Sequence, residues 1–129
     1  MESSGAFRNR RNRAVPRNPL LTFGRNLPHA TEDIKWKMDL CFSIGGKMFA
    51  VFNVDDVSQI SFKTTPATFA MLTKQTGIIP APYAARFHWV SVRDPKALPR
   101  KALEELIEES YQLVAAGLPR KVRKKLGME

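Results

Sequence analysis

The sequence predicts a small α+β domain in which helices flank an antiparallel sheet built around a β-meander. Alternating apolar and polar residues in the first half of the chain indicate strands, and a long amphipathic pattern near the end indicates a helix. The length of 129 residues suits one hydrophobic core and is too short for two ordinary domains. The expected element order is α-β-β-β-α-β-α, in a domain that spans residues 18–119.

A short first helix is expected to begin at Asn18 and Pro19. Asparagine is a favoured helix N-cap, and proline is favoured at the first helical position. Leu20, Phe23 and Leu27 follow at a spacing that places them on one helical face. We therefore expect this helix to pack one side against the core.

Four strands are expected from period-two patterns. Residues 31–33 are predicted to be a polar link, after which alternating apolar residues indicate a half-buried strand. Gly45 and Gly46 indicate a two-residue hairpin, because both positions of such a turn take positive φ, and Asp55 and Asp56 turn the chain again. The expected strands cover residues 34–44, 47–54, 57–63 and 87–92.

Two further helices are expected in the second half. Thr65 before Pro66 is a helix start, and Gly77 is predicted to stop a helix of about ten residues. The prolines within residues 78–83 predict a loop, because proline lacks an amide donor. The clearest helix covers residues 99–116. Its apolar stripe comprises Leu103, Leu106, Ile107, Ser110, Tyr111 and Val114.

The net charge of +9 is concentrated at the two ends of the chain. Residues 1–17 lack apolar periodicity and are predicted to be a flexible basic arm, and residues 120–129 form a basic tail, either irregular or a short helix. Residues 27–119 hold ten Lys or Arg against ten Asp or Glu, so their charge is balanced. Polyanion binding would therefore depend on the ends or on a local patch.

Little in the sequence indicates catalysis or metal binding. Cys41 has no glycine-rich turn or helix start beside it and is predicted to be structural. His29 and His88 have no partner at metal-ligand spacing. The four glutamates of the 99–116 helix lie opposite its apolar stripe, as on a solvated face. The expectation is a non-enzymatic protein without cofactor or metal.

The cell compartment is predicted from what the chain lacks. No apolar run approaches the roughly 20 residues that a membrane span needs, and no hydrophobic segment follows the N-terminal arginines. The single cysteine cannot form an intramolecular disulfide, as is usual in a reducing compartment. A cytoplasmic location without a membrane partner is expected.

Several segments along the chain resemble one known protein family. They are LPHATED at 27–33, the tryptophan at position 36, GGKMFAVF at 45–52, ISFKTTP at 60–66, HWVSV at 88–92 and SYQLVAAGLP at 110–119. Their order and spacing are similar to those of the MmcQ/YjbR-like family over about residues 27–119. Each motif alone is weak, whereas the series is specific.

The resemblance implies a fold related to the CyaY-like arrangement, in which helices pack on an antiparallel sheet and hairpins project in a double-wing fashion. It also implies DNA binding, a role inferred for the family from its fold. The family's first helix is usually longer than the one expected here. The candidate nucleic-acid contacts are Lys47, Lys63, Arg86, His88, Trp89, Arg120, Lys121, Arg123, Lys124 and Lys125.

The leading hypothesis is therefore non-catalytic DNA binding, in which basic residues contact phosphates and aromatic residues can stack bases. The alternative is a small-molecule or protein interaction domain that uses a cleft near Trp36, Tyr83 and Trp89, although tryptophans more often fill a core. Iron handling, by analogy with the CyaY-like fold, ranks lower because the acidic run shares its helix with Arg100 and Lys101. The DNA sequence preference and the oligomeric state stay open.

Overall fold

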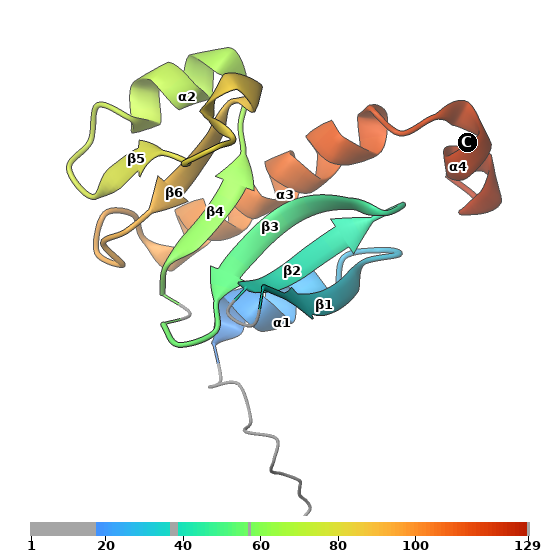
Figure 1. The fold of residues 1–129 in the computed structure, drawn as a ribbon, viewed down its shortest axis with the longest axis horizontal. Coiled ribbons are helices and arrows are strands. Elements are labelled where there is room, and N and C mark those ends of the chain that lie inside the picture. The colour runs from blue at the N-terminus through green and yellow to red at the C-terminus, as the bar shows by residue number, and fades with distance from the viewer. Residues whose placement is uncertain (1–17, 37–38, 57, 129) are drawn as a thin grey trace, which may run out of the picture.

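The protein folds around one six-stranded antiparallel sheet with the strand order β1-β2-β3-β4-β6-β5 (Figure 1). The computed structural model describes residues 18–36, 39–56 and 58–128, so the arm expected at residues 1–17 lies outside them. The elements are α1 (Pro19–Arg25), β1 (Thr31–Lys35), β2 (Asp39–Ile44), β3 (Lys47–Asn53), β4 (Ile60–Lys63), α2 (Pro66–Leu72), β5 (Ile78–Pro80), η1 (Ala85–Phe87), β6 (Trp89–Val92), α3 (Arg100–Ala116) and α4 (Arg120–Lys125). The predicted α+β class and its meander, β1 to β4, are confirmed.

The helix starts predicted at Asn18 and Thr65 are both present. The Asn18 side chain accepts a hydrogen bond from the Leu20 amide at 2.8 Å, and the Thr65 hydroxyl accepts one from the Thr68 amide at 3.2 Å. Each bond satisfies an amide that the first turn of a helix leaves without a partner. Helix α2 ends at Leu72 and is shorter than predicted, with residues 73–77 forming turns.

The prediction of one strand over residues 34–44 was wrong in its first part. The chain folds back at Trp36, whose φ is 54°, and β1 pairs antiparallel with β2 from Thr31 opposite Ser43 to Lys35 opposite Asp39. Strand β1 includes the supposed polar link 31–33. Because β1 is an edge strand with four of its five residues exposed, it lacks the apolar alternation that a half-buried strand shows.

The loop predicted over residues 78–83 was also wrong in part, because β5 occupies Ile78–Pro80. Among the described strands it pairs with β6 alone, and proline is tolerated on such an edge strand. The strand predicted over 87–92 begins instead at Trp89, after the short helix η1 and His88, whose φ is 66°.

The hydrophobic core lies on one face of the sheet, where α1 and α3 cover it (Figure 1). Phe42, Phe52, Phe62 and Val90 point into this core from neighbouring strands, and Ile107 meets them from α3; all five are fully buried. The alternate positions of β2, β3, β4 and β6 face the other way and form the open face of the sheet. No helix in the described part of the chain is long and apolar enough to cross a membrane.

The sheet forks between β3 and β4, and Ser110 of α3 holds the fork. The two strands pair from Phe52 opposite Ile60 to Ala50 opposite Phe62. Beyond that point the Ser110 hydroxyl donates to the Phe49 carbonyl at 2.6 Å and accepts from the Lys63 amide at 2.9 Å. The fork separates two wings, the first made of β1, β2 and β3 and the second of β4, β6 and β5 (Figure 1).

Helix α4 packs against the turn of the β2–β3 hairpin. Gly45 and Gly46 form this turn with φ of 59° and 83°, as predicted. A Cβ atom on Gly45 would lie 2.8 Å from Leu118 and 3.0 Å from Val122, whereas a Cβ atom on Gly46 would meet nothing within 4 Å. Residues 120–125 of the basic tail therefore form a short helix seated on the hairpin.

The two glycines allow a matched test of this contact. Either change to alanine places a Cβ atom in the left-handed region, which costs about 1–2 kcal/mol. Gly45→Ala must also displace Leu118 and Val122, so we expect it to lower the free energy of unfolding by roughly 1 kcal/mol more than Gly46→Ala. Urea unfolding measures both variants, and equal losses would show that α4 does not press on the turn.

Candidate functional site

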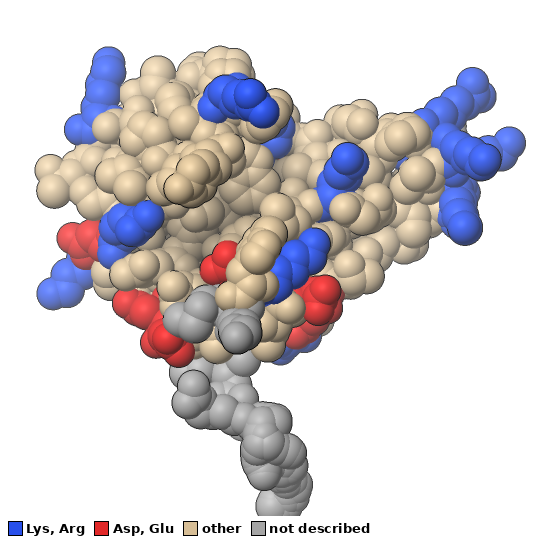
Figure 2. Space-filling view, in the orientation of Figure 1, with Lys and Arg blue, Asp and Glu red and all other residues tan. Residues whose placement is uncertain are grey.

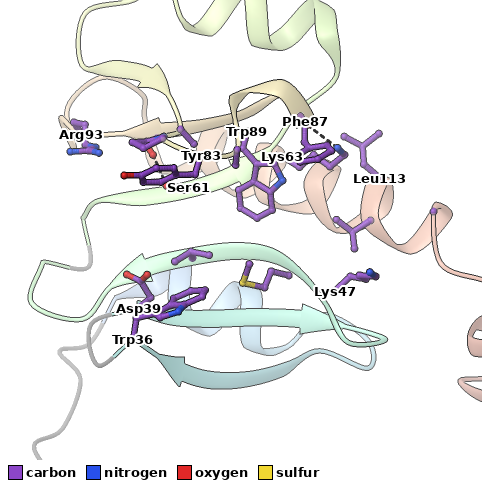
Figure 3. A pocket seen from close by; sticks show the side chains of 18 residues that line it. Trp36, Asp39, Lys47, Ser61, Lys63, Tyr83, Phe87, Trp89, Arg93 and Leu113 are labelled. Carbon is purple, nitrogen blue, oxygen red and sulfur yellow. Dashed lines mark hydrogen bonds between the residues drawn. The ribbon is translucent and has the colours of Figure 1, made fainter.

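A cleft of about 720 Å³ opens on the uncovered face of the sheet, between the two wings (Figure 3). Its floor comes from the open-face positions of β3, β4 and β6, including Val51, Ser61 and Ser91. The two serine hydroxyls lie 2.6 Å apart and hydrogen-bond to each other across the β4–β6 pair. The C-terminal end of α3 closes one end of the cleft with Leu113, Val114 and Gly117.

Large aromatic side chains stand on both rims of the cleft. Trp36 from the first wing is 69% exposed. From the second wing, Tyr83 is fully exposed and Phe87 is 51% exposed. Figure 3 shows Trp36 and Tyr83 on opposite sides of the opening, with Trp89 between Tyr83 and Phe87. The exposure of Trp36 rules out the core role that a tryptophan in a small domain usually has.

Two of the rim residues, Trp36 and Tyr83, have an unusual backbone conformation. Trp36 has a φ of 54° and Tyr83 a φ of 66°, in the left-handed region that bulky residues rarely adopt. Such conformations cost about 1–3 kcal/mol each and cluster at functional sites. The fold thus holds two exposed aromatic rings at the same cleft in backbone conformations that glycine would adopt more easily.

The cleft concentrates positive charge although the body of the protein is neutral. Lys47, Lys63 and Arg93 line it, and Asp39 is the acidic residue among the described lining residues. Lys63 donates from Nζ to the Phe87 carbonyl at 2.8 Å, which ties β4 to η1. Figure 3 shows Lys47 and Lys63 at the α3 end, and Arg93 and Asp39 at the other.

The predicted contact residues do not all come together. Lys47, Lys63 and Trp89 line the cleft, and Arg86 lies beside its rim with the guanidinium carbon 4.8 Å from the centre of the Phe87 ring. His88 does not line the cleft. Its ring packs edge-on against Phe69 of α2 at 5.5 Å.

His88 serves the site through its backbone. Its carbonyl accepts hydrogen bonds from the Thr64 amide at 2.8 Å and from the Thr64 hydroxyl at 2.7 Å, which extends the pairing of β4 with β6. The left-handed φ of His88 turns the chain from η1 into β6. Trp89, the next residue, then has its side chain on the cleft side of the sheet.

The basic residues of α4 gather beyond the α3 end of the cleft, at the right of Figure 2. Gly117 lines the cleft, and α4 begins soon after it at Arg120. Arg123 differs from its neighbours, because its Nη1 donates to the Ala115 carbonyl at 2.9 Å and caps the end of α3. The remaining cations, Arg120, Lys121, Lys124 and Lys125, are exposed.

Cys41 lies near the cleft but is 1% exposed. Burial, aided by the negative charge of Asp39, raises the pKa of its thiol, so the thiol stays protonated at neutral pH. Its Sγ approaches the Asp39 carbonyl at 3.7 Å, which suits a weak donor in a structural role. Among the described residues, no three His, Cys, Asp or Glu side chains lie together in a way that could hold a metal ion.

Some lining residues were not singled out from the sequence. Asp39, Ser61, Ser91 and the end of α3 belong to this group. A signal for the strand residues was present, since Ser61 and Lys63 alternate with the buried Ile60 and Phe62 and so had to face the other side. The contribution of α3 had no such signal, because it depends on the fork at Ser110.

The forked sheet and its open cleft define the protein as a small α+β domain with two wings. The YjbR family model matches residues 25–113, and the chain belongs to the YjbR family. Among solved structures, the Deinococcus radiodurans protein DR2400, with the family-model domain DUF419, is 27% identical with a TM-score of 0.73, over 85% of this chain and 86% of that one. A Pseudomonas syringae protein of similar fold is 23% identical with a TM-score of 0.61, over 77% of this chain and 98% of that one. No curated protein sequence matches this chain.

Proposed function

We propose that the protein binds nucleic acid, DNA in the first instance, without catalysing a reaction on it. The observation that carries this proposal is the meeting of three cations with exposed aromatic rings in one cleft, in a body whose charges balance overall. Lys and Arg side chains supply phosphate contacts, and aromatic faces accept bases of any sequence. The site therefore fits a ligand that carries both anionic and planar groups.

The distribution of acidic residues supports the same ligand. The four glutamates of α3 are part of the balanced count but are not among the described residues that line the cleft. One of them, Glu104, faces Arg100 on its own helix at 3.8 Å. A phosphate chain that enters the cleft meets Lys47, Lys63 and Arg93 and avoids the acidic part of the helix.

Helix α4 extends the positive surface beyond the cleft. It sits on the turn before Lys47, since Leu118 and Val122 adjoin Gly45. Its exposed cations thus lie next to the end of the cleft where Lys47 and Lys63 stand (Figures 2 and 3). The cleft and the exposed cations of α4 together form the candidate surface for a phosphate backbone.

The second candidate function is binding of a planar small molecule between Trp36, Tyr83 and Trp89. The volume of the cleft favours it, because about 720 Å³ lies within the range of ordinary ligand pockets. A neutral small molecule would bind with little dependence on salt. A nucleic acid would lose affinity steeply as salt rises.

The test measures binding of the full chain to fluorescently labelled single-stranded and duplex DNA. Fluorescence anisotropy over a salt series gives the affinity at each salt concentration. The double variant Lys47→Gln with Arg93→Gln removes one cation from each end of the cleft. The salt slope on a single strand should fall by about 0.7 per phosphate contact, or about 1.4 for the two contacts removed, which amounts to roughly 25-fold in affinity near 0.1 M salt.

The matched control is Lys74→Gln with Lys96→Gln, two exposed lysines that do not line the cleft. It removes the same charge and should change the affinity far less. Equal losses in the two double variants would place binding elsewhere on the protein. The absence of binding to either DNA at low salt would overturn the proposed function.

A further inference from the structure

We infer that the cleft takes single-stranded nucleic acid, whose unpaired bases stack on Trp36 and Tyr83 while its backbone runs toward Lys47 and Lys63. The inference rests on the proposed function and specifies the form of the ligand. It is carried by the shape of the site, by the exposure of the aromatic rings and by the excess of positive charge at the α3 end of the cleft.

The shape of the site argues against a duplex. A protein reads duplex DNA by inserting a convex element, such as a helix or a two-stranded ribbon, into a groove. Here the cations and aromatic rings line a concave cleft of about 720 Å³, which suits a base or sugar that projects from its strand. The β2–β3 hairpin is such a ribbon, but Leu118 and Val122 pack against one side of its turn.

The aromatic rings are placed where unpaired bases would need them. Trp36 and Tyr83 face the cleft from opposite wings, and both keep most of their surface in water. Large exposed apolar surfaces around one cleft mark a binding site rather than a packing defect. Bases within a duplex are already stacked and paired, so only a single strand offers both faces of a base to such rings.

The two ends of the cleft differ in a way that suggests how the strand lies. Trp36 and Tyr83 stand toward one end, where Arg93 and Asp39 offset each other in formal charge, and Lys47 and Lys63 stand at the other, beside the end of α3 (Figure 3). A strand laid along the cleft therefore places bases at the first end and phosphates at the second. It leaves the cleft on the side of α4, which carries further exposed cations.

The experiment compares labelled oligodeoxythymidylate with the same strand annealed to oligodeoxyadenylate, using the full chain. We expect tighter binding of the single strand, by roughly tenfold or more, because only the single strand offers free base faces. Trp36→Ala and Tyr83→Ala should each weaken single-strand binding by roughly tenfold. Neither variant removes a cation, so the salt slope should stay unchanged.

Two further variants separate stacking from loss of exposed surface. Trp36→Phe keeps an aromatic ring and should retain most of the affinity, whereas Met71→Ala removes a side chain that is 60% exposed on α2 and should have no effect. Quenching of tryptophan fluorescence on binding, reduced in Trp36→Phe, reports contact at this rim.

The outcomes distinguish this inference from the proposed function. The inference would be overturned by equal affinity for strand and duplex together with unchanged affinity in Trp36→Ala and Tyr83→Ala. If the Lys47 and Arg93 double variant still lost affinity in that case, nucleic-acid binding would stand. Failure to bind either DNA would overturn the proposed function itself. Preference for the strand together with loss in both aromatic variants supports the inference.

Discussion

Replacing Ser110 with alanine is expected to lower the free energy of unfolding by about 2–4 kcal/mol, because one hydroxyl serves two backbone groups at the fork. The Lys63 amide and the Phe49 carbonyl belong to strands that have stopped pairing with each other at this point. Ser110 is fully buried, so water cannot easily replace its hydroxyl. Each group left without a partner costs about 1–3 kcal/mol.

The matched control is Ser61→Ala. The Ser61 hydroxyl also makes a short hydrogen bond, to Ser91 at 2.6 Å, but it is part-buried on the open face, and its loss leaves one side-chain hydroxyl rather than two backbone groups without this partner. Its loss should cost about 1 kcal/mol. Urea unfolding of both variants measures the difference, and a Ser110→Ala protein as stable as Ser61→Ala would show that the fork does not depend on this hydroxyl.

The fork also connects stability with the site. The Lys63 amide donates to the Ser110 hydroxyl, while the Lys63 side chain lines the cleft and donates from Nζ to the Phe87 carbonyl. A change at Ser110 therefore reaches both a cleft cation and the rim that carries Phe87. We accordingly attribute the relative placement of the two wings to α3, which contacts β3 and β4.

The parts of the fold that could be predicted are those with local signals. The caps at Asn18 and Thr65, the hairpin at Gly45 and Gly46 and the long helix α3 each depend on residues close together in sequence. Strands β1 and β5 lacked such signals. Both are edge strands with largely exposed side chains, so neither shows the alternation by which a half-buried strand is predicted.

The site could be predicted only in part, and for a related reason. Lys47, Lys63 and Trp89 were identified from motifs, but the cleft that joins them depends on contacts between distant segments. The fork brings Phe49, Lys63 and Ser110 together, and no pattern within any one segment indicates it. The count of balanced charge over residues 27–119 is correct as an average, but an average does not indicate the local excess of cations in the cleft.

Neutralising three lysines of α4 is expected to lower affinity for a long single strand by roughly 100-fold near 0.1 M salt. The variant combines Lys121→Gln, Lys124→Gln and Lys125→Gln, three exposed residues on the helix that follows the α3 end of the cleft. It leaves Arg123 in place, because Arg123 caps α3 through the Ala115 carbonyl. If each lysine meets one phosphate, the salt slope falls by about 0.7 per lysine, or about 2 in all.

The control variant removes the same charge elsewhere on the surface. It combines Lys74→Gln, Lys96→Gln and Lys101→Gln, three exposed lysines outside both the cleft and α4. Its salt slope should stay near that of the parent chain. A strand just long enough to fill the cleft should bind the α4 variant almost as well as the parent, because its phosphates end before α4. Equal slopes for the two triple variants would mean that α4 only seals the hairpin turn, and the phosphate path would then end at Lys47 and Lys63.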